Sequence, residues 1–382
     1  MESPIDTDAC SSRLTVDLDA LRANYRSIAD RVAPARCGAV VKANAYGLGI
    51  ALVAPALQRE GCRSFFVAQL CEAAPLARAI GRGADIFILN GLDPGSEAAC
   101  AHAGFLPVLN SRSQVERWRA LARAEGRPLP AALQVDSGMS RLGLPPAEAE
   151  VLAADPALSR EIDLRLLMTH LACADEPERA ANAEQLARFD AVRARFPGVQ
   201  ASIANSGGAF LPPAFHCDLA RPGIALYGVD PGPRATELRA VVRLDVRVLQ
   251  IRTIAAGTGV GYGLDHVAAA PQRLATIAIG YADGWPRSLS GKGAAWHRGV
   301  RLPITGRVSM DSLTVDITAL PDDALAEGDF VELLGPSQSP SGVARDAGTI
   351  GYEILTRLGT RHARTYVEGG VVTHRFAAGE QA

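Results

Sequence analysis

The sequence predicts an α/β protein in which a (β/α)8 barrel of the TIM type is followed by a mostly-β C-terminal domain. Two observations indicate this. From about residue 35 to 230, short aliphatic runs alternate with longer helical patterns. After about residue 236 the hydrophobic pattern changes to period two, and glycine-rich turns separate the runs. We therefore expect the barrel over residues 1–235 and the β domain over residues 236–382.

The aliphatic runs of the first part are each followed by a segment long enough for a helix. This alternation is typical of parallel βαβ units, and eight units are the number that closes a barrel. The eight expected strands are 38–41, 64–67, 85–89, 106–109, 131–135, 164–168, 200–203 and 217–220.

The flanking elements follow from the same patterns. Residues 14–17 alternate like a strand that could join either domain, and Asp19 can cap the helix that follows. That helix places Leu21, Tyr25, Ile28 and Val32 on one face. In the C-terminal part we expect strands near 239–248, 273–279, 313–317 and 329–333, and a helix near 349–358.

Composition excludes several classes of function. The formal net charge is −2 and the arginines are scattered, so neither nucleic acid nor an anionic membrane is an expected partner. The seven cysteines are odd in number and widely spaced, which favours a reducing compartment. Residues 1–8 have no signal-peptide pattern, so we expect a cytoplasmic protein. No metal is expected, because no H-E-x-x-H or comparable spacing occurs.

Lysine is almost absent from this chain. Lys42 and Lys292 are the only lysines among 39 basic residues. Lys42 follows an apolar run, where an arginine would serve solubility equally well. A primary amine can lose its proton and form a Schiff base, which a guanidinium cannot do. The alternative is a lysine at a strand end that extends its stem toward water.

The residues with chemical potential follow the expected strands. They are Lys42, Arg141, His170, 205–208 and 221–224. In such barrels the strand ends form one rim, which carries the active site. A hydroxyl with glycines suits a phosphate cradle built from backbone N–H groups. A lysine amine, a phosphate site and an arginine together suggest pyridoxal phosphate.

Each of these residues also has a purely structural interpretation. His170 could be a satisfied, partly buried histidine, Arg221 an ion-pair partner, Arg141 a loop charge, and residues 205–207 a helix cap. Their joint placement on one rim favours the functional interpretation. The glycine-rich run 257–263 lies between strands instead of opening a helix, so we reject a dinucleotide loop.

At this point the sequence resembles the bacterial alanine racemase family, pyridoxal-phosphate enzymes with a barrel and a C-terminal β domain. The resemblance extends essentially from end to end. It depends on residues 41–47 (VKANAYG), 136–143 (DSGMSRLG), 168–170 (MTH), 204–206 (ANS), 221–228 (RPGIALYG), 261–263 (GYG), 279–284 (IGYADG) and 306–311 (GRVSMD).

The resemblance implies a two-base racemase of L- and D-alanine that supplies D-alanine for peptidoglycan. Lys42 would hold the cofactor as a Schiff base and act on D-alanine, and Tyr262 would act on L-alanine from the partner of a head-to-tail homodimer. Arg221 would donate to the pyridine nitrogen. His170 would link Arg221 to Tyr262.

The resemblance also implies the binding residues. Arg141 would lie near the phenolic oxygen of the cofactor and the substrate carboxylate. The backbone N–H of Met310 would bind the same carboxylate, next to Asp311, and Tyr281 would narrow the entrance. The remaining positions that match cofactor-binding residues, most of them at the phosphate, are Tyr46, Asn205, Ser206, Gly223, Ile224 and Tyr352.

Two positions depart from the family pattern. Many members have a lysine that becomes carbamylated where this chain has Gln134, so the amide could hydrogen-bond Arg141 directly, or a bound anion could replace the charge. Leu48 stands where a histidine is common, which would alter the mouth of the site. Competing functions are a broader racemase for serine or basic amino acids, an amino-acid decarboxylase and a non-catalytic cofactor carrier.

Overall fold

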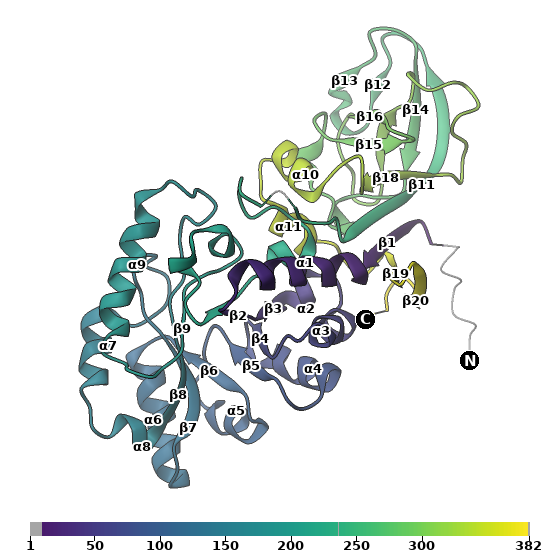
Figure 1. The fold of residues 1–382 in the computed structure, drawn as a ribbon. Helices are drawn as coiled ribbons and strands as arrows, with labels where there is room; N and C mark the ends of the chain where they lie inside the picture. The colour runs from purple at the N-terminus through teal and green to yellow at the C-terminus, as the bar shows by residue number, and fades with distance from the viewer. Residues whose placement is uncertain (1–9, 236, 381–382) are drawn as a thin grey trace, which may run out of the picture.

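The computed structural model describes residues 10–235 and 237–380. Two expectations fall outside these ranges. They concern residues 1–8, in which we expect no signal peptide, and residue 236, the first of the expected β domain. Figure 1 shows a barrel of strands and helices in the purple-to-teal half and a separate β-rich part in the green-to-yellow half. This confirms the predicted fold class.

Parallel strands form the barrel wall. A seven-stranded sheet has the order β3-β4-β5-β6-β7-β8-β9, and β10 pairs with β2. The N–H of Gly38 donates to the carbonyl of Ala220 at 2.9 Å, and that of Arg221 to Ala204 at 2.8 Å, which joins the last strand to both neighbours. The strands are β2 (Arg36–Cys37), β3 (Ala39–Val40), β4 (Ser64–Val67), β5 (Asp85–Ile88), β6 (Leu106–Leu109), β7 (Leu129–Gln134), β8 (Ile162–Met168), β9 (Ala201–Ser202) and β10 (Leu219–Ala220).

Amphipathic helices cover the outside of these strands (Figure 1). They are α1 (Leu18–Val32), α3 (Ile50–Arg59), α4 (Leu70–Ile80), α5 (Glu97–Ala103), α6 (Arg112–Glu125), α7 (Pro146–Ala153), α8 (Leu158–Glu161) and α9 (Ala180–Arg193). The short segment α2 (Lys42–Tyr46) is a left-handed turn at the barrel rim. The expected cap of the first helix was wrong by two residues. Asp17 is the N-cap and accepts from the N–H of Ala20 at 2.8 Å, because Asp19 already lies in the first turn.

The second part is a sheet with the order β14-β17-β16-β15-β18-β11-β1-β19-β20. Its pairs are antiparallel except β1 with β19. The N-terminal strand β1 (Ser12–Asp17) therefore joins this sheet, with Leu14 opposite Leu244. The other elements are β11 (Val242–Ile254), β12 (Gly259–Val260), β13 (His266–Val267), β14 (Gln272–Ile277), β15 (Ala294–His297), β16 (Val300–Thr305), β17 (Leu313–Asp316), β18 (Phe330–Leu334), α10 (Pro340–Ala347), α11 (Gly351–Thr356), β19 (Ala363–Glu368) and β20 (Val371–Phe376).

The junction of the two parts lies beside the loop that follows Lys42. From β19, Arg364 donates to the carbonyl of Gly47 at 2.6 Å, and the hydroxyl of Tyr366 donates to that of Leu48 at 2.8 Å. Both side chains are buried. The second domain therefore fixes the backbone of the rim where the candidate chemistry lies.

Candidate active site

A cavity of about 250 Å³ opens at the carboxyl ends of the barrel strands. None of its lining residues is acidic, so three cations face it without a carboxylate in the wall. A ligand with negative charge suits such a wall. The lining residues are Val40, Lys42, Tyr46, Leu89, Asn90, Gln134, Arg141, Leu142, His170, Asn205, Ser206, Arg221, Gly223 and Tyr352.

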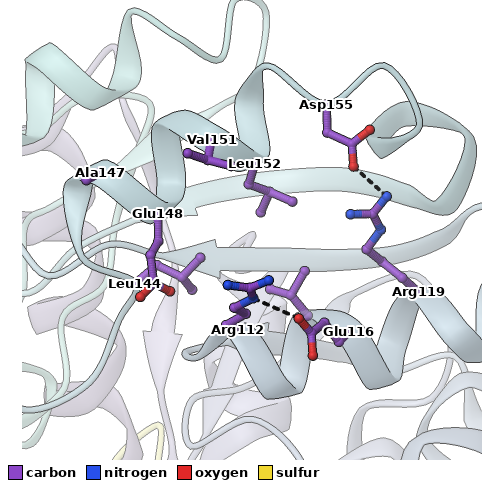
Figure 2. A pocket seen from close by; sticks show the side chains of 10 residues that line it. Arg112, Glu116, Arg119, Leu144, Ala147, Glu148, Val151, Leu152 and Asp155 are labelled. Carbon is purple, nitrogen blue, oxygen red and sulfur yellow. Dashed lines mark hydrogen bonds and ion pairs between the residues drawn. The ribbon is translucent and has the colours of Figure 1, made fainter.

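A larger cavity, of about 500 Å³, lies between α6 and α7 on the outside of the barrel (Figure 2). Its walls share no residue with the first cavity. Arg112 pairs with Glu116 at 2.8 Å and Arg119 with Asp155 at 2.7 Å. No lysine, histidine, cysteine or serine lines it, so it offers no nucleophile or proton-transfer group comparable to Lys42.

Lys42 opens a left-handed turn. Ala43, Asn44, Ala45 and Tyr46 have φ of 53°, 53°, 54° and 56°, a conformation that non-glycine residues seldom adopt. The side chain of Asn44 helps to hold the turn by accepting from the N–H of Ile50 at 2.7 Å. Backbone of this kind is found where a functional side chain must be aimed.

The environment of Lys42 favours a reactive amine. Burial lowers its pKa, and the nearby positive charge of Arg141 lowers it further, while Glu72 raises it. Within the described ranges Lys42 makes no hydrogen bond or ion pair. The amine is therefore available to a ligand in the cavity.

Arg221 is a buried guanidinium, and no carboxylate among the described residues pairs with it. Nη2 donates to the carbonyl of Thr169 at 2.7 Å, and Nη1 donates to the hydroxyl of Ser202. Burial lowers the pKa of Arg221 to about 10, so the side chain stays protonated at neutral pH. Its other N–H groups are available to an acceptor in the cavity that it lines.

Hydroxyl-bearing side chains also line the cavity, and one of them, Ser206, holds the backbone of the loop after β10. The hydroxyl of Ser206 accepts from the N–H of Gly223 at 2.8 Å and from that of Ala225 at 3.3 Å. The rings of Tyr46 and Tyr352 lie 6.2 Å apart. Burial raises the pKa of Tyr352 to about 12, so its hydroxyl remains a donor. Ile224 is fully buried and does not line the cavity.

His170 lies at the end of β8. Burial lowers its pKa to about 3, and the positive charges of Arg221 and Arg141 add to the effect. The imidazole is therefore neutral near pH 7, with Nε2 at 3.5 Å from Nδ2 of Asn205. The expected hydrogen bond from Arg221 to His170 is not formed within the described residues, because the guanidinium of Arg221 donates to Thr169 and Ser202 instead.

Besides Ile224, four expected site residues of the second domain do not line this cavity. Tyr262 is 71% exposed in a turn between β12 and β13, which Figure 1 shows at the end of the second domain farthest from the barrel. Tyr281 and Met310 are also exposed, and Asp311 pairs with Arg361 at 2.7 Å. None of the four lines the cavity of Lys42 in its own chain.

For the two departures from the family pattern, the expected direct contacts are not formed, and the alternative of a bound anion beside Arg141 stays a prediction. The amide of Gln134 donates to the carbonyl of Leu142 at 3.1 Å, so the expected direct bond to Arg141 is not formed. Gln134 thus ties down the loop beside Arg141. Leu48 is fully buried and does not line the cavity, so it does not shape the mouth as expected.

Two residues near Lys42 were missed by sequence reasoning. Asn90 lies two residues after the end of β5 and lines the cavity. The rule that selected Lys42, a polar residue after a barrel strand, would have found it. Glu72 lies in the first turn of α4, where a glutamate ordinarily indicates only a capping box.

The described part of the chain contains neither a metal-binding cluster nor a membrane-spanning helix. No group of three histidine, cysteine or acidic side chains is placed to hold a metal ion. No helix in the ranges that the structure describes has the length and apolar character needed to cross a membrane.

Comparison with known proteins identifies the family. The model of the alanine racemase N-terminal domain matches residues 16–231, and that of the alanine racemase C-terminal domain matches residues 241–366. The chain belongs to the alanine racemase family. It is 54% identical to a protein of Mesorhizobium japonicum named a catabolic alanine racemase, over 96% of each chain. It is also 54% identical to an alanine racemase of Brucella canis, over 94% of each chain.

Solved structures of the family share the fold. An alanine racemase of Bartonella henselae, with covalently bound pyridoxal phosphate, has a TM-score of 0.91 and 47% identity over 94% of this chain and 100% of its own. The biosynthetic alanine racemase of Pseudomonas aeruginosa has a TM-score of 0.87 and 38% identity over 94% of this chain and 100% of its own.

Proposed function

We propose that this chain is a pyridoxal-phosphate-dependent isomerase that interconverts L- and D-alanine as a cytoplasmic, head-to-tail homodimer. The observation that carries the proposal is the cavity that holds a buried arginine, a lysine amine without a partner among the described residues, and the hydroxyl-bearing residues Tyr46, Ser206 and Tyr352. Seven free cysteines fit a reducing compartment. We also propose the division of the chain between residues 235 and 236.

The residues present fit the cofactor. Gly223 leaves space in the cradle that a side chain would fill, since a Cβ there would lie 2.3 Å from the hydroxyl of Tyr46. The phosphate would be held by Tyr46, Ser206, Gly223 and Tyr352, with the backbone of Ile224. Hydroxyl donors of this kind suit an anion.

The ring of the cofactor would be held from the other side of the cavity. Arg221 would donate to the pyridine nitrogen and, with its pKa at about 10, would leave that nitrogen unprotonated at neutral pH. Asn205 and Arg141 would contact the remaining ring substituents. When bound, pyridoxal phosphate withdraws electrons from the α-carbon of an amino acid and so acidifies its α-proton.

Lys42 and Tyr262 would exchange that proton on opposite faces. The lowered pKa of Lys42 enlarges the fraction of neutral amine, which can accept a proton from D-alanine. Tyr262 would accept it from L-alanine, and because it lies outside its own cavity, it would act in the site of the partner. Neutral His170 lies beside Asn205 in the cavity wall and would hydrogen-bond Tyr262 of the partner once the dimer forms.

Substrate selection would come from both subunits. Arg141 is exposed at the cavity and would bind the substrate carboxylate with the N–H of Met310 from the partner. Asp311 would orient this loop, and Tyr281 would restrict the pocket to a small side chain. Arginine suits the role because its fork binds a carboxylate through two hydrogen bonds.

The test is to incubate the purified chain with L-alanine and pyridoxal phosphate in heavy water, and to separate and weigh the enantiomers. Deuterated D-alanine is the expected product. Deuterium in L-alanine alone would contradict racemisation, and no exchange would contradict the function as a whole. Serine, arginine and lysine as substrates separate a strict alanine enzyme from a broader racemase, and carbon dioxide release would reveal a decarboxylase.

The physiological role is a separate part of the proposal. Supply of D-alanine for peptidoglycan predicts that deletion of the gene makes growth dependent on added D-alanine. The name of the Mesorhizobium japonicum relative favours a second candidate, breakdown of alanine, and then deletion would impair growth on D-alanine as carbon source. Growth of the deletion strain on the two media decides between them.

A further inference from the structure

Glu72 connects the ends of two barrel strands through one carboxylate. Oε1 accepts from the N–H of Ala43 at 2.5 Å, and Ala43 is the residue after Lys42. Oε2 accepts from the N–H groups of Ala68 and Gln69 at 2.7 and 3.0 Å, and these residues follow β4. The carboxylate thus joins the turn of Lys42 to the neighbouring strand end.

A helix cap explains only half of this arrangement. In a capping box, a glutamate in the first turn returns to the backbone N–H at the start of its own helix. Oε2 does this for α4, through Gln69. Oε1 instead reaches a different element and satisfies the first N–H of the left-handed turn, at Ala43. A cap alone does not require that second contact.

The turn needs such an anchor because its backbone conformation is unfavourable. Left-handed conformations cost on the order of 1–2 kcal/mol for each non-glycine residue, and four such residues follow one another at 43–46. Asn44 holds the middle of the turn, and Arg364 holds its end at Gly47. Glu72 holds the beginning, beside Lys42 itself.

Glu72 also supplies a negative charge to a cationic site. The charged groups that act on Lys42 are Arg141 from the loop after β7 and Glu72 from α4, while His170, which also lines the cavity, is neutral. Arg141 lowers the pKa of Lys42, and Glu72 raises it. Since the cavity wall contains no acidic residue, Glu72 is the carboxylate that offsets its positive charge at Lys42.

We propose that Glu72 is a positioning residue for Lys42, which anchors the start of the left-handed turn through the N–H of Ala43 and joins it to the end of β4. The proposal rests on the proposed function, because it concerns the lysine that would hold the cofactor. Glu72 acts through the backbone and through its charge, without contact to the substrate.

The experiment uses the fact that this chain has only two lysines. The full chain, freed of cofactor, is acetylated with acetic anhydride across a pH series, and mass spectrometry follows Lys42 and Lys292. Exposed Lys292 is the internal reference. The matched control for E72Q is E97Q, because Glu97 also lies in the first turn of a barrel helix, where it accepts from the N–H of Gly95 at 2.8 Å.

In E72Q the labelling of Lys42 should shift to lower pH, because Arg141 and burial then act unopposed, while Lys292 stays unchanged. The dissociation constant of pyridoxal phosphate should rise at least about tenfold, as for the loss of a hydrogen bond to a charged acceptor. E97Q should change neither the labelling of Lys42 nor the dissociation constant of pyridoxal phosphate. If E72Q melts lower but keeps the labelling curve and cofactor affinity of the wild type, Glu72 is only a cap and the proposal is overturned.

A second variant covers the case in which E72Q does not fold. E72D keeps the charge but is one methylene shorter, so the labelling curve of Lys42 should stay near the wild type while cofactor affinity falls. Wild-type affinity in E72D would contradict the anchoring role. Labelling requires neither cofactor nor alanine, so failure of the wild type to bind pyridoxal phosphate would refute the proposed function and leave this readout valid.

Discussion

Gly223→Ala probes the floor of the proposed phosphate cradle most directly. A Cβ built at Gly223 would lie 2.3 Å from Oη of Tyr46, 3.1 Å from its Cζ and 3.3 Å from Cβ of Val40. The backbone of Gly223, at φ −126°, lies outside the left-handed region, so the expected effect is steric. Tyr46 cannot move away freely, because its ring lies 4.7 Å from that of buried Tyr227.

The expected cost is that of an overpacked core, about 1–3 kcal/mol. In a chain of this length that loss lowers the melting temperature by about 1–4 °C. Displacement of the Tyr46 hydroxyl should also weaken pyridoxal-phosphate binding by about tenfold or more, as for one lost hydrogen bond to a charged group. Thermal melts and an absorbance titration with pyridoxal phosphate measure the two effects.

The matched control is Gly342→Ala in α10, where the nearest atom to the added Cβ is Oγ of Ser339 at 3.6 Å. This change should leave the cofactor affinity unchanged and raise stability by about 0.5–1 kcal/mol. Tyr46→Phe should partly relieve the clash in the double variant, because the nearest remaining ring atom lies 3.1 Å away. If Gly223→Ala matches the wild type in both assays, the reasoning from the cradle geometry is wrong.

Three further outcomes are expected. The pKa of His170 is about 3 in the folded state, against an ordinary 6.5, so the stability that the neutral side chain contributes is present above pH 6.5 and is lost as the pH falls toward 3. The melting temperature of His170→Gln should therefore fall less steeply on acidification than that of the wild type. Mixed Lys42→Ala and Tyr262→Phe chains should regain about a quarter of wild-type racemase activity through heterodimers, by random pairing of subunits, whereas each variant alone stays inactive. Ser206→Ala should cost about 1–3 kcal/mol in chemical unfolding, because the buried N–H of Gly223 loses its acceptor.

The barrel strands could be predicted from the sequence where side chains on both faces of the strand are buried, because such strands appear as continuous apolar runs. The expected strand 64–67 coincides with β4, whose four residues are all buried, and 106–109 coincides with β6. The last two strands are shorter than expected, and β9 and β10 have two residues each. Beyond them the backbone makes isolated hydrogen bonds, such as that from the N–H of Arg221 to the carbonyl of Ala204, instead of a regular ladder. Alternating hydrophobicity alone does not reveal where regular pairing ends.

Two hairpins of the second domain were missed although their turns carry a signal. Arg298 and Gly299 join β15 to β16 with φ of 48° and 80°, and Gly369 and Gly370 join β19 to β20 with φ of 63° and 75°. Two consecutive left-handed residues are typical of a tight hairpin turn. The pairing of β1 could not be predicted, because its partners β11 and β19 are distant in the sequence.

The rim residues could be predicted because strand direction alone gathers them. Lys42, His170 and Arg221 follow different strands, and parallel strands must end on the same side. Hydrogen bonds between these side chains could not be predicted, since they depend on rotamers, and Arg221 bonds Thr169 and Ser202 instead of His170. Tyr262 was identified only through the resemblance, because no strand rule connects a turn of the second domain to the barrel rim.

The second domain therefore has two separate relations to the chemistry. Its end near the barrel completes the site of its own chain, with Tyr352 in the cavity wall and Arg364 on the loop after Lys42. Its far end exposes Tyr262, which is therefore accessible to another molecule. A site with Lys42 but no second base could remove a proton from only one face. Racemisation would then require a second copy of the chain, so dimer formation and catalysis would be lost or gained together.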